Sequence, residues 1–200
     1  MDHKIILFYR YVFIDNIEEM ISYLHNLCSE LKILGRILVA NEGINGTLAS
    51  GCNNIDQFME TLVNDPKFKN IDWKISLGRG NLPFNDLHVK QVKELIGCGE
   101  AKSVIDGSIS FDEDTYGGLA GTGVHLSPAA FHDAILNNDG ILLDIRNDYE
   151  YSIGHFNNAI NLSTNTFAET WRALDKVVEQ QANSLSEKKS KNIYMYCTGL

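Results

Sequence analysis

The first hundred residues alternate between strand-like and helix-like patterns of apolar positions. Residues 5–14 are rich in β-branched and aromatic side chains, which predicts a strand. Asp15 and Asn16 then offer a helix cap, and apolar residues follow at the spacing of one helix face: Ile17, Met20, Ile21, Leu24 and Leu27. The chain therefore starts with a strand followed by an amphipathic helix.

A glycine-containing segment separates the next two predicted strands. Residues 35–40 and 47–49 have strand composition, and 41–46 has turn composition. We predict a hairpin in which Gly43 and Gly46 relieve positive φ angles in the turn.

A second helix and further strands complete the pattern of the first half. Asn53 and Asn54 are predicted to cap a helix whose apolar residues are Ile55, Phe58, Met59 and Leu62. Residues 71–77 alternate as a strand, and further strands at 87–92 and 94–96 would extend the same sheet. The order βαββαβ predicts a ferredoxin-like (acylphosphatase-like) α+β fold.

Composition changes after this point. Residues 97–123 are rich in Gly, Asp and Ser, which is typical of a linker. We therefore divide the chain into a ferredoxin-like domain at 1–103, a linker at 104–123 and a second domain at 124–200.

The second domain alternates between helices and strands. Ser127 and Pro128 are predicted to start a helix whose inward side chains are Phe131, Ile135 and Leu136. Strands are predicted at 140–145 and 191–196, with a helix at 167–178 between them. This alternation predicts a parallel sheet, so the chain as a whole is of the α/β class.

Composition and charge narrow the location and the partners. The chain has a formal net charge of -9, and it contains no run of the ~18 to 20 apolar residues that a membrane span requires. It also shows no signal peptide pattern, which predicts a cytoplasmic protein. The four cysteines lack C-x-x-C spacing, so we predict neither a disulfide framework nor a metal site.

The charge is uneven along the chain. Residues 1–103 carry 11 Lys and Arg against 13 Asp and Glu, whereas residues 104–200 carry 6 against 13. The first half is the better candidate to contact a polyanion. Ordinary solvated charges are the alternative explanation of these cations: Arg10, Lys32, Arg36, Lys67, Lys69, Lys74, Arg79, Lys90 and Lys93.

Cys197 stands at the end of the last predicted strand and is followed by Thr198 and Gly199. A loop of exposed backbone amides there would favour the thiolate, which is the nucleophilic form of cysteine. Considered alone, Cys197 is better interpreted as a buried structural cysteine, because cysteine is among the most buried residue types.

The surrounding residues resemble the rhodanese domains. The resemblance is carried by Leu143-Asp-Ile-Arg146, by Tyr149-Glu-Tyr151, by Gly154-His-Phe-Asn-Asn-Ala159 and by the strand that leads into Cys197. It implies that Cys197 is the catalytic nucleophile in an active-site loop that includes Thr198 and Gly199. We expect these four polar residues to support the site structurally: Asp144, Arg146, Glu150 and His155.

The first half resembles the N-terminal region of bacterial tRNA uridine hydroxylases. The segments that carry this resemblance are 8–13, 37–48 and 84–94. The resemblance implies oxygen-dependent conversion of the wobble uridine (position 34) of certain tRNAs to 5-hydroxyuridine, with Cys197 required. Molecular oxygen would be the co-substrate and the anticodon region of tRNA the partner, and the family has no established metal or organic cofactor.

Residues 41–47 could be only a hairpin turn, or their amides and Asn side chains could hold a phosphate or the edge of an unpaired base. We predict that RNA contacts come from this segment and nearby cations: Asn41, Glu42, Asn45, Arg10 and Arg36. The aromatic residues Tyr9, Tyr11 and Trp73 are interpreted as core or sheet-face residues rather than stacking platforms.

The end of the chain departs from the family pattern. The family loop reads Cys-Thr-Gly-Gly-Ile-Arg, whereas here Leu200 follows Gly199 and the sequence stops. We therefore expect a truncated rhodanese domain, and a 200-residue form that is inactive and poorly folded in its second half. Two alternative functions are a rhodanese-type sulfurtransferase that forms a cysteine persulfide, and a non-catalytic binding module.

Overall fold

The structure is a computed structural model that divides the chain into two compact units. It describes residues 2–95, 110–112, 118, 123–137, 140–166, 169–170, 173–174, 176–177 and 192–197. The first unit comprises Met1–Leu95 with Lys102–Thr122, and the second comprises Ile96–Ala101 with Gly123–Leu200. The domain limits expected at 103 and 123 stay predictions.

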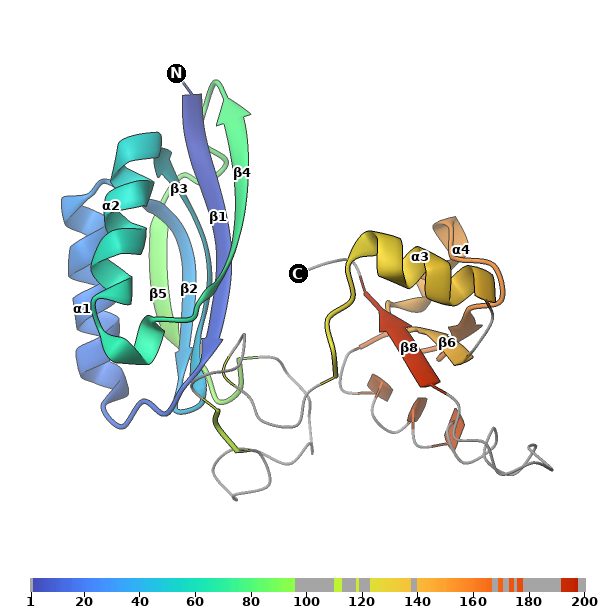
Figure 1. Ribbon diagram of the computed structural model, residues 1–200. Coiled ribbons are helices and arrows are strands. Elements are labelled where there is room, and N and C mark those ends of the chain that lie inside the picture. The colour runs from blue at the N-terminus through green and yellow to red at the C-terminus, as the bar shows by residue number, and fades with distance from the viewer. Residues whose placement is uncertain are drawn as a thin grey trace. The chain divides into compact units, whose positions relative to one another are not determined.

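The first unit has the predicted βαββαβ order followed by one more strand (Figure 1). The elements are β1 Asp2–Tyr11, α1 Ile17–Glu30, β2 Leu34–Ala40, β3 Gly43–Gly51, α2 Cys52–Val63, a 3-10 turn Pro66–Phe68, β4 Asp72–Arg79 and β5 Leu87–Gln91. The prediction of an additional strand at 94–96 is wrong at Glu94 and Leu95, because neither residue is in a strand. Ile96 lies outside the described residues.

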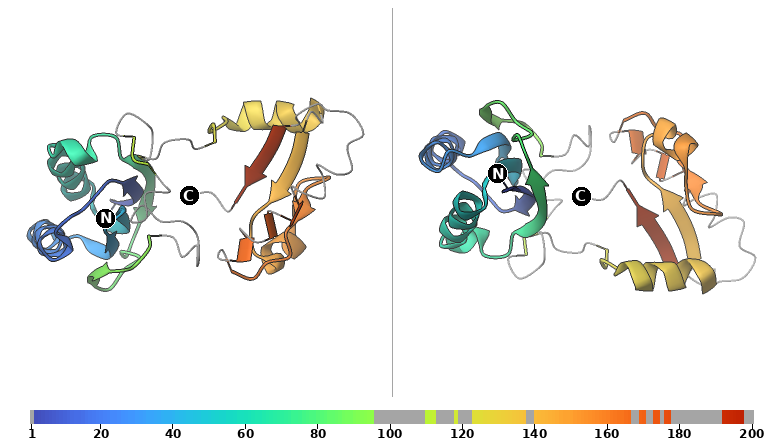
Figure 2. Two further views of the ribbon diagram at one scale, coloured as in Figure 1. Left: turned by 90° about the horizontal axis from the view of Figure 1, so that it is seen from below. Right: turned by 90° about the horizontal axis from the view of Figure 1, so that it is seen from above.

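These strands form one sheet in the order β4-β1-β3-β2-β5. All pairs are antiparallel except β2 with β5, which is parallel. Both helices pack on one face of the sheet (Figures 1 and 2). Side chains from that face and the two helices form a buried core that includes Ile6, Phe8, Leu24, Ile37, Ile44, Leu48 and Phe58.

The hairpin between β2 and β3 differs from the prediction. Its turn is confined to residues 41–42, and Gly43 and Gly46 already belong to β3. Gly43 does have a positive φ of 140°. Gly46 does not: a Cβ there would lie 2.7 Å from the ring of Phe8, so glycine is required at this position for space.

Of the two helix caps predicted in the first unit, one is confirmed and one is wrong. Asn16 caps α1, because its side chain accepts a hydrogen bond from the backbone N–H of Glu19 at 3.1 Å. Gly51 caps α2 without a side-chain hydrogen bond, and the two residues predicted as its cap, Asn53 and Asn54, lie within the helix.

The second unit contains the predicted parallel sheet. Its elements are α3 Pro128–Asn137, β6 Gly140–Asp144, α4 Asp148–Ile153, β7 Ile160–Asn161 and β8 Asn192–Tyr196. Both β7 and β8 pair with β6 in parallel, and α3 lies along one face of the sheet (Figure 2). Half of the helix predicted at 167–178 lies outside the described residues, and its described residues, 169–170, 173–174 and 176–177, are helical.

The start of α3 is confirmed, since the Ser127 hydroxyl accepts a hydrogen bond from the Ala130 N–H at 3.2 Å. Its inward face was assigned partly wrongly. Phe131 and Ile135 are half-buried, but Leu136 is 68% exposed.

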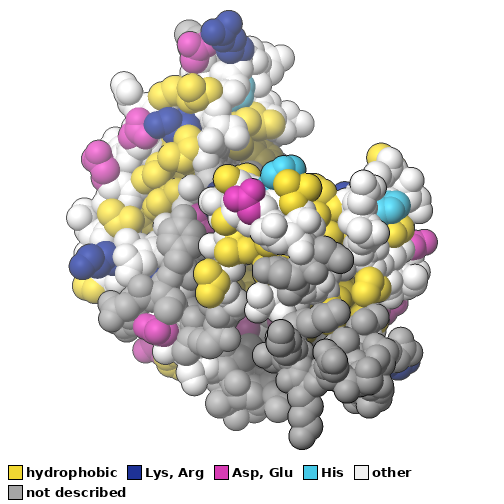
Figure 3. All heavy atoms as spheres, turned by 45° about the vertical axis from the view of Figure 1, so that its right-hand side comes forward, with side chains coloured by type: hydrophobic (Ala, Val, Ile, Leu, Met, Phe, Trp, Pro, Cys, Tyr) yellow, Lys and Arg dark blue, Asp and Glu magenta, His cyan; other side chains and the backbone are white. Residues whose placement is uncertain are grey.

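Hydrophobic and charged side chains are intermingled on the surface seen in Figure 3. Among the described residues, no helix has the length and apolar character needed to cross a membrane.

Candidate functional site at the carboxyl ends of β6 and β8

The register of the parallel sheet brings together two residues that are 52 positions apart. Asp144, the last residue of β6, pairs with Tyr196, the last residue of β8. Cys197 follows directly and is exposed. The thiol therefore lies at the carboxyl end of a parallel sheet, where α/β folds usually place their functional loops.

Asp144 is the centre of a polar network at the carboxyl end of this sheet. Its carboxylate is completely buried and accepts hydrogen bonds from the Arg146 side chain, with Nε–Oδ1 at 2.9 Å and Nη2–Oδ2 at 2.6 Å. The backbone N–H of Arg146 also donates to Oδ1, at 3.0 Å. Arg146 reaches further and donates from Nη2 to the Gly154 carbonyl at 2.7 Å. This fork joins the end of β6 to the loop that follows α4.

Tyr196 connects the network to the last strand, a role that the sequence analysis missed. Its hydroxyl donates to Asp144 Oδ2 at 2.6 Å and accepts from the Phe156 N–H at 3.3 Å. The Arg146 guanidinium also lies 5.3 Å from the centre of the Tyr196 ring. Since Cys197 is the next residue, these contacts determine where the chain carries its thiol.

The network also changes ionisation. Burial alone would raise the pKa of Asp144, but hydrogen bonds from Arg146 and Tyr196 outweigh it, so the pKa is lowered. The same carboxylate raises the pKa of Arg146. Burial, followed by the hydrogen bond to Asp144, raises the pKa of Tyr196. The site therefore holds Asp144 as a carboxylate and Tyr196 as a neutral donor at neutral pH.

Glu150 and His155 flank this network without touching Cys197 in any described contact. Glu150 accepts a hydrogen bond from the Asn147 N–H at 3.2 Å and completes a capping box at the start of α4. The His155 ring stacks on Tyr151 with ring centres 3.7 Å apart, and its Nδ1 lies 3.0 Å from the Tyr151 carbonyl oxygen. Glu150 thus fixes the start of α4, and His155 fixes the turn between α4 and β7.

Two of the residues predicted for the active-site loop, Thr198 and Gly199, lie outside the described residues. The part of the loop that the structure describes is Cys197 itself. The roles expected of all three stay predictions.

The residues predicted to contact RNA occupy different environments in the first unit. Arg36 is exposed and forms an ion pair with Asp86. Asn45 is half-buried in β3. Asn41 is half-buried too, and its side-chain N–H donates to the Ile14 carbonyl at 2.9 Å.

The two other candidates are buried. Arg10 is 1% exposed, and it donates hydrogen bonds to the carbonyls of Lys67 and Asn70, both at 3.3 Å. Glu42 is 9% exposed and accepts from the Leu95 N–H at 2.6 Å. Through these contacts Arg10 and Glu42 stabilise the first unit. Because both side chains are buried, the geometry does not support their predicted contacts with RNA.

Comparison with known protein families accounts for both units. Residues 3–95 match the family described as UPF0176 acylphosphatase like domain, and residues 127–199 match the Rhodanese-like domain. The chain thus combines a UPF0176 N-terminal domain with a rhodanese-like domain. This finding confirms the predicted fold classes of both halves.

Curated relatives match nearly the whole chain. A protein named tRNA uridine(34) hydroxylase from Listeria welshimeri is 34% identical over 198 residues, and one of the same name from Staphylococcus saprophyticus is 34% identical over 199. These matches cover 99% and 100% of this chain but only 56% and 57% of the relatives. The predicted resemblance to this family is confirmed, and the chain spans little more than half the length of these relatives.

Proposed function

We propose that this protein takes part in tRNA modification, as an oxidoreductase that hydroxylates the wobble uridine (position 34) to 5-hydroxyuridine. Molecular oxygen is the co-substrate, Cys197 is required, and the anticodon region of tRNA is the partner. A tRNA substrate also implies that the protein works in the cytoplasm.

The observation that supports this proposal is the presence of both domains, together with a thiol at the carboxyl end of the second sheet. Both domains are matched in this chain, and relatives that align with 99% and 100% of it bear the name of that activity at 34% identity. The geometry adds a reason why one cysteine matters. Cys197 is exposed at the end of β8, whereas Cys28 is buried and its pKa is raised to about 12 by that burial.

The test is nucleoside analysis of tRNA from a bacterial strain that lacks its own uridine hydroxylase and carries the gene for this protein. The expected result is 5-hydroxyuridine, or nucleosides made from it, at position 34. A Cys197→Ser variant should abolish the product, and the matched control Cys28→Ser should not. Absence of the product with the wild-type gene, in a strain shown to make the protein, would refute the proposal for the 200-residue form and would agree with the inactivity expected from its sequence, which stays a prediction.

A rhodanese-type sulfurtransferase is the second candidate, and the exposed thiol after a parallel strand favours it. In that reaction the Cys197 thiolate attacks the outer sulfur of thiosulfate, the new S–S bond forms a persulfide, and the old S–S bond breaks to release sulfite. Cyanide-releasable sulfur on the wild type but not on Cys197→Ser, together with unchanged tRNA, would select this function. A Cys197→Ser variant with no defect in either assay would instead indicate a non-catalytic binding module.

A further inference from the structure

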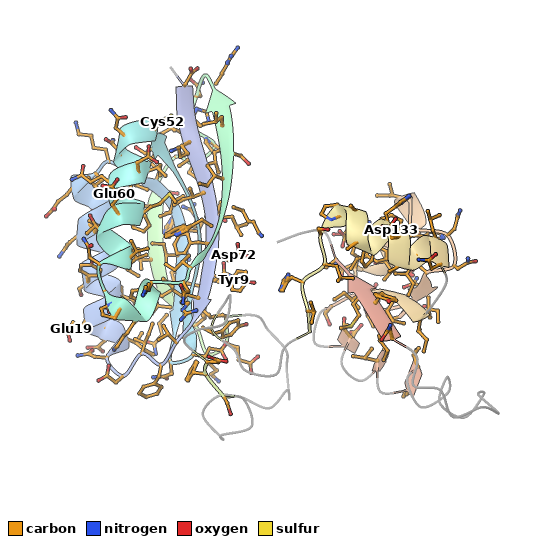
Figure 4. All side chains as sticks on the ribbon, viewed as in Figure 1. Tyr9, Glu19, Cys52, Glu60, Asp72 and Asp133 are labelled. Carbon is orange, nitrogen blue, oxygen red and sulfur yellow. The ribbon has the colours of Figure 1, made fainter. Side chains whose placement is uncertain are left out.

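The sheet of the first unit has a second face, opposite α1 and α2, and its side chains form ordered rows. In antiparallel and parallel pairs alike, residues in register lie on the same face. Figure 4 shows Tyr9 and Asp72 on the side of the sheet away from the helices, while Glu19 and Glu60 lie on the helices. We refer to the face that holds Tyr9 as the tyrosine face.

One row crosses all five strands at Tyr9. The register pairs Tyr9 of β1 with Asp72 of β4 and with Asn45 of β3. Asn45 pairs in turn with Leu38 of β2, which pairs with Lys90 of β5. The row thus has a half-buried aromatic ring and an amide in its middle, and an exposed lysine at its β5 end.

The adjacent row repeats this arrangement. Leu7 pairs with Lys74 on one side and with Thr47 on the other. Thr47 pairs with Arg36, which pairs with His88. An apolar side chain and a hydroxyl group again lie in the middle, and cationic residues lie toward both edges.

The charges of the two layers are opposite. The helices contain no lysine or arginine, and their acidic residues are Glu18, Glu19, Glu30, Asp56 and Glu60. On the tyrosine face the carboxylate of Asp72 is 1% exposed and is paired with Lys74 at 3.1 Å. Arg36 on this face is likewise paired with Asp86, so the attraction of the face for a polyanion depends on the exposed Lys90. A polyanion is therefore repelled by the helical layer and attracted to Lys90 on the opposite face.

Tyr9 and Tyr11 supply the aromatic surface. Both lie on this face two residues apart in β1, and their ring centres are 6.3 Å apart. Bases of single-stranded RNA stack on aromatic side chains of a sheet, while duplex bases are already stacked on each other. Amide and hydroxyl groups such as those of Asn45 and Thr47 can bond the edges of unpaired bases.

We propose that the tyrosine face binds an unpaired segment of RNA. Tyr9 stacks on a base, Asn45 bonds a base edge, and Lys90 contacts the phosphate backbone. We therefore revise the interpretation of Tyr9 from the sequence, which gave it a place on a sheet face without a stacking role. This inference rests on the proposed function for the identity of the RNA, and it adds a surface made of residues other than those around Cys197.

The test uses the whole chain and a fluorescently labelled RNA hairpin with an unpaired loop, with binding followed by anisotropy. Loop RNA should bind more tightly than a blunt RNA duplex. Tyr9→Leu removes the ring and should weaken binding by about fivefold or more. The matched variant Tyr9→Phe keeps the ring and should bind as the wild type does, although it loses the hydroxyl that bonds Asp72.

A second pair of variants tests the phosphate contact independently of Tyr9. Lys90→Gln should lower the slope of log affinity against log salt concentration by about 0.7, the value for one phosphate contact on a single strand. Lys69→Gln makes the same charge change at an exposed residue outside the sheet, and it should leave the slope unchanged.

Three results would overturn the proposal: equal affinity for loop and duplex, equal binding by Tyr9→Leu and Tyr9→Phe, or equal slopes for the two lysine variants. Circular dichroism checks that the Tyr9→Leu variant is folded. If it is not, the comparison of Lys90→Gln with Lys69→Gln tests the proposal instead. If the binding results hold but no 5-hydroxyuridine is found, the proposed function fails and this surface stands. If the nucleoside is made but the variants bind normally, the surface fails alone.

Discussion

In the first unit, Ile6 and Phe8 of the interior strand β1 are completely buried under two helices, whereas Ile193 and Met195 of β8 in the second unit are 41% and 48% exposed. Apolar packing therefore holds the first sheet. The ends of the second sheet are held by Asp144, which is buried and receives hydrogen bonds from Arg146 and Tyr196. The difference teaches that one chain can position strands by area removed from water or by directional polar contacts.

The largest effect should come from the apolar core of the first unit. Phe58→Ala removes a ring that is completely buried and packs 6.0 Å from Phe8 and 6.4 Å from Trp73, between ring centres. We expect the free energy of unfolding of this unit to fall by about 3–5 kcal/mol, measured by urea titration. Ile153→Ala, at a site 86% exposed in the second unit, is the control and should change stability little.

The next effect should come from the polar network. Asp144→Asn keeps the shape but removes the charge that Arg146 binds, and we expect a loss of about 2 kcal/mol at neutral pH. Because the folded pKa of Asp144 is lowered, its contribution is complete above the ordinary carboxyl pKa of about 4 and is lost as the pH falls through the folded value. The stability difference between wild type and variant should therefore shrink in acid. A difference that is constant with pH would contradict this account.

A smaller effect is expected where space, not charge, is limiting. Gly46→Ala would place a Cβ 2.7 Å from the Phe8 ring and 3.1 Å from the Arg36 carbonyl oxygen. Overpacking of this kind should cost about 1–3 kcal/mol in thermal or urea unfolding of the first unit. Gly154→Ala is the matched control, since its φ of 171° is extended and a Cβ there meets nothing within 4 Å. If the two variants lost equally little stability, the side chains around Gly46 would have to rearrange at little cost.

The smallest effects should be the same in both units. Asn16→Ala and Ser127→Ala each remove one cap hydrogen bond, of 3.1 Å and 3.2 Å respectively. Each should cost about 1 kcal/mol, because a cap acts on its own helix end and not through the core. Helix content and unfolding of the two variants provide the measurement, and a much larger loss at Ser127 would mean that α3 holds the second sheet together.

The periodicity of apolar residues predicted most helices and strands of both units. The errors lie at positions whose structure depends on contacts with residues distant in the sequence. Asn53 and Asn54 have the composition of a cap, yet α2 already starts at Cys52. Gly46 has turn composition, yet it pairs with Phe8 and Ile37 within β3, where glycine is required because the Phe8 ring leaves no room for a larger residue. Leu136 matches the apolar spacing of α3 but is exposed, since the spacing alone does not tell how much of a helix face its partners cover.

For the candidate site, sequence motifs identified Asp144, Arg146 and Cys197, and they missed Tyr196. No local pattern marks this tyrosine, because it lies in an apolar strand and its acceptor is 52 residues away. The same holds for the tyrosine face. Alternation in β1 puts Tyr9 and Tyr11 on one face, but only the pairing of five strands adds Asn45 and Lys90.

The sequence by itself determined the order of helices and strands in the first unit, two capped helix starts and the position of the thiol after a strand, but it did not predict α4 and β7 of the second unit. Those properties depend on neighbours within a few residues, through the 3.6- and 2-residue periods and local hydrogen bonds. Only the tertiary structure decided that Tyr196 bonds Asp144, that Arg10 is buried, and which side chains share a row across the first sheet. These depend on strand register, and register is a property of strands that are far apart in the chain.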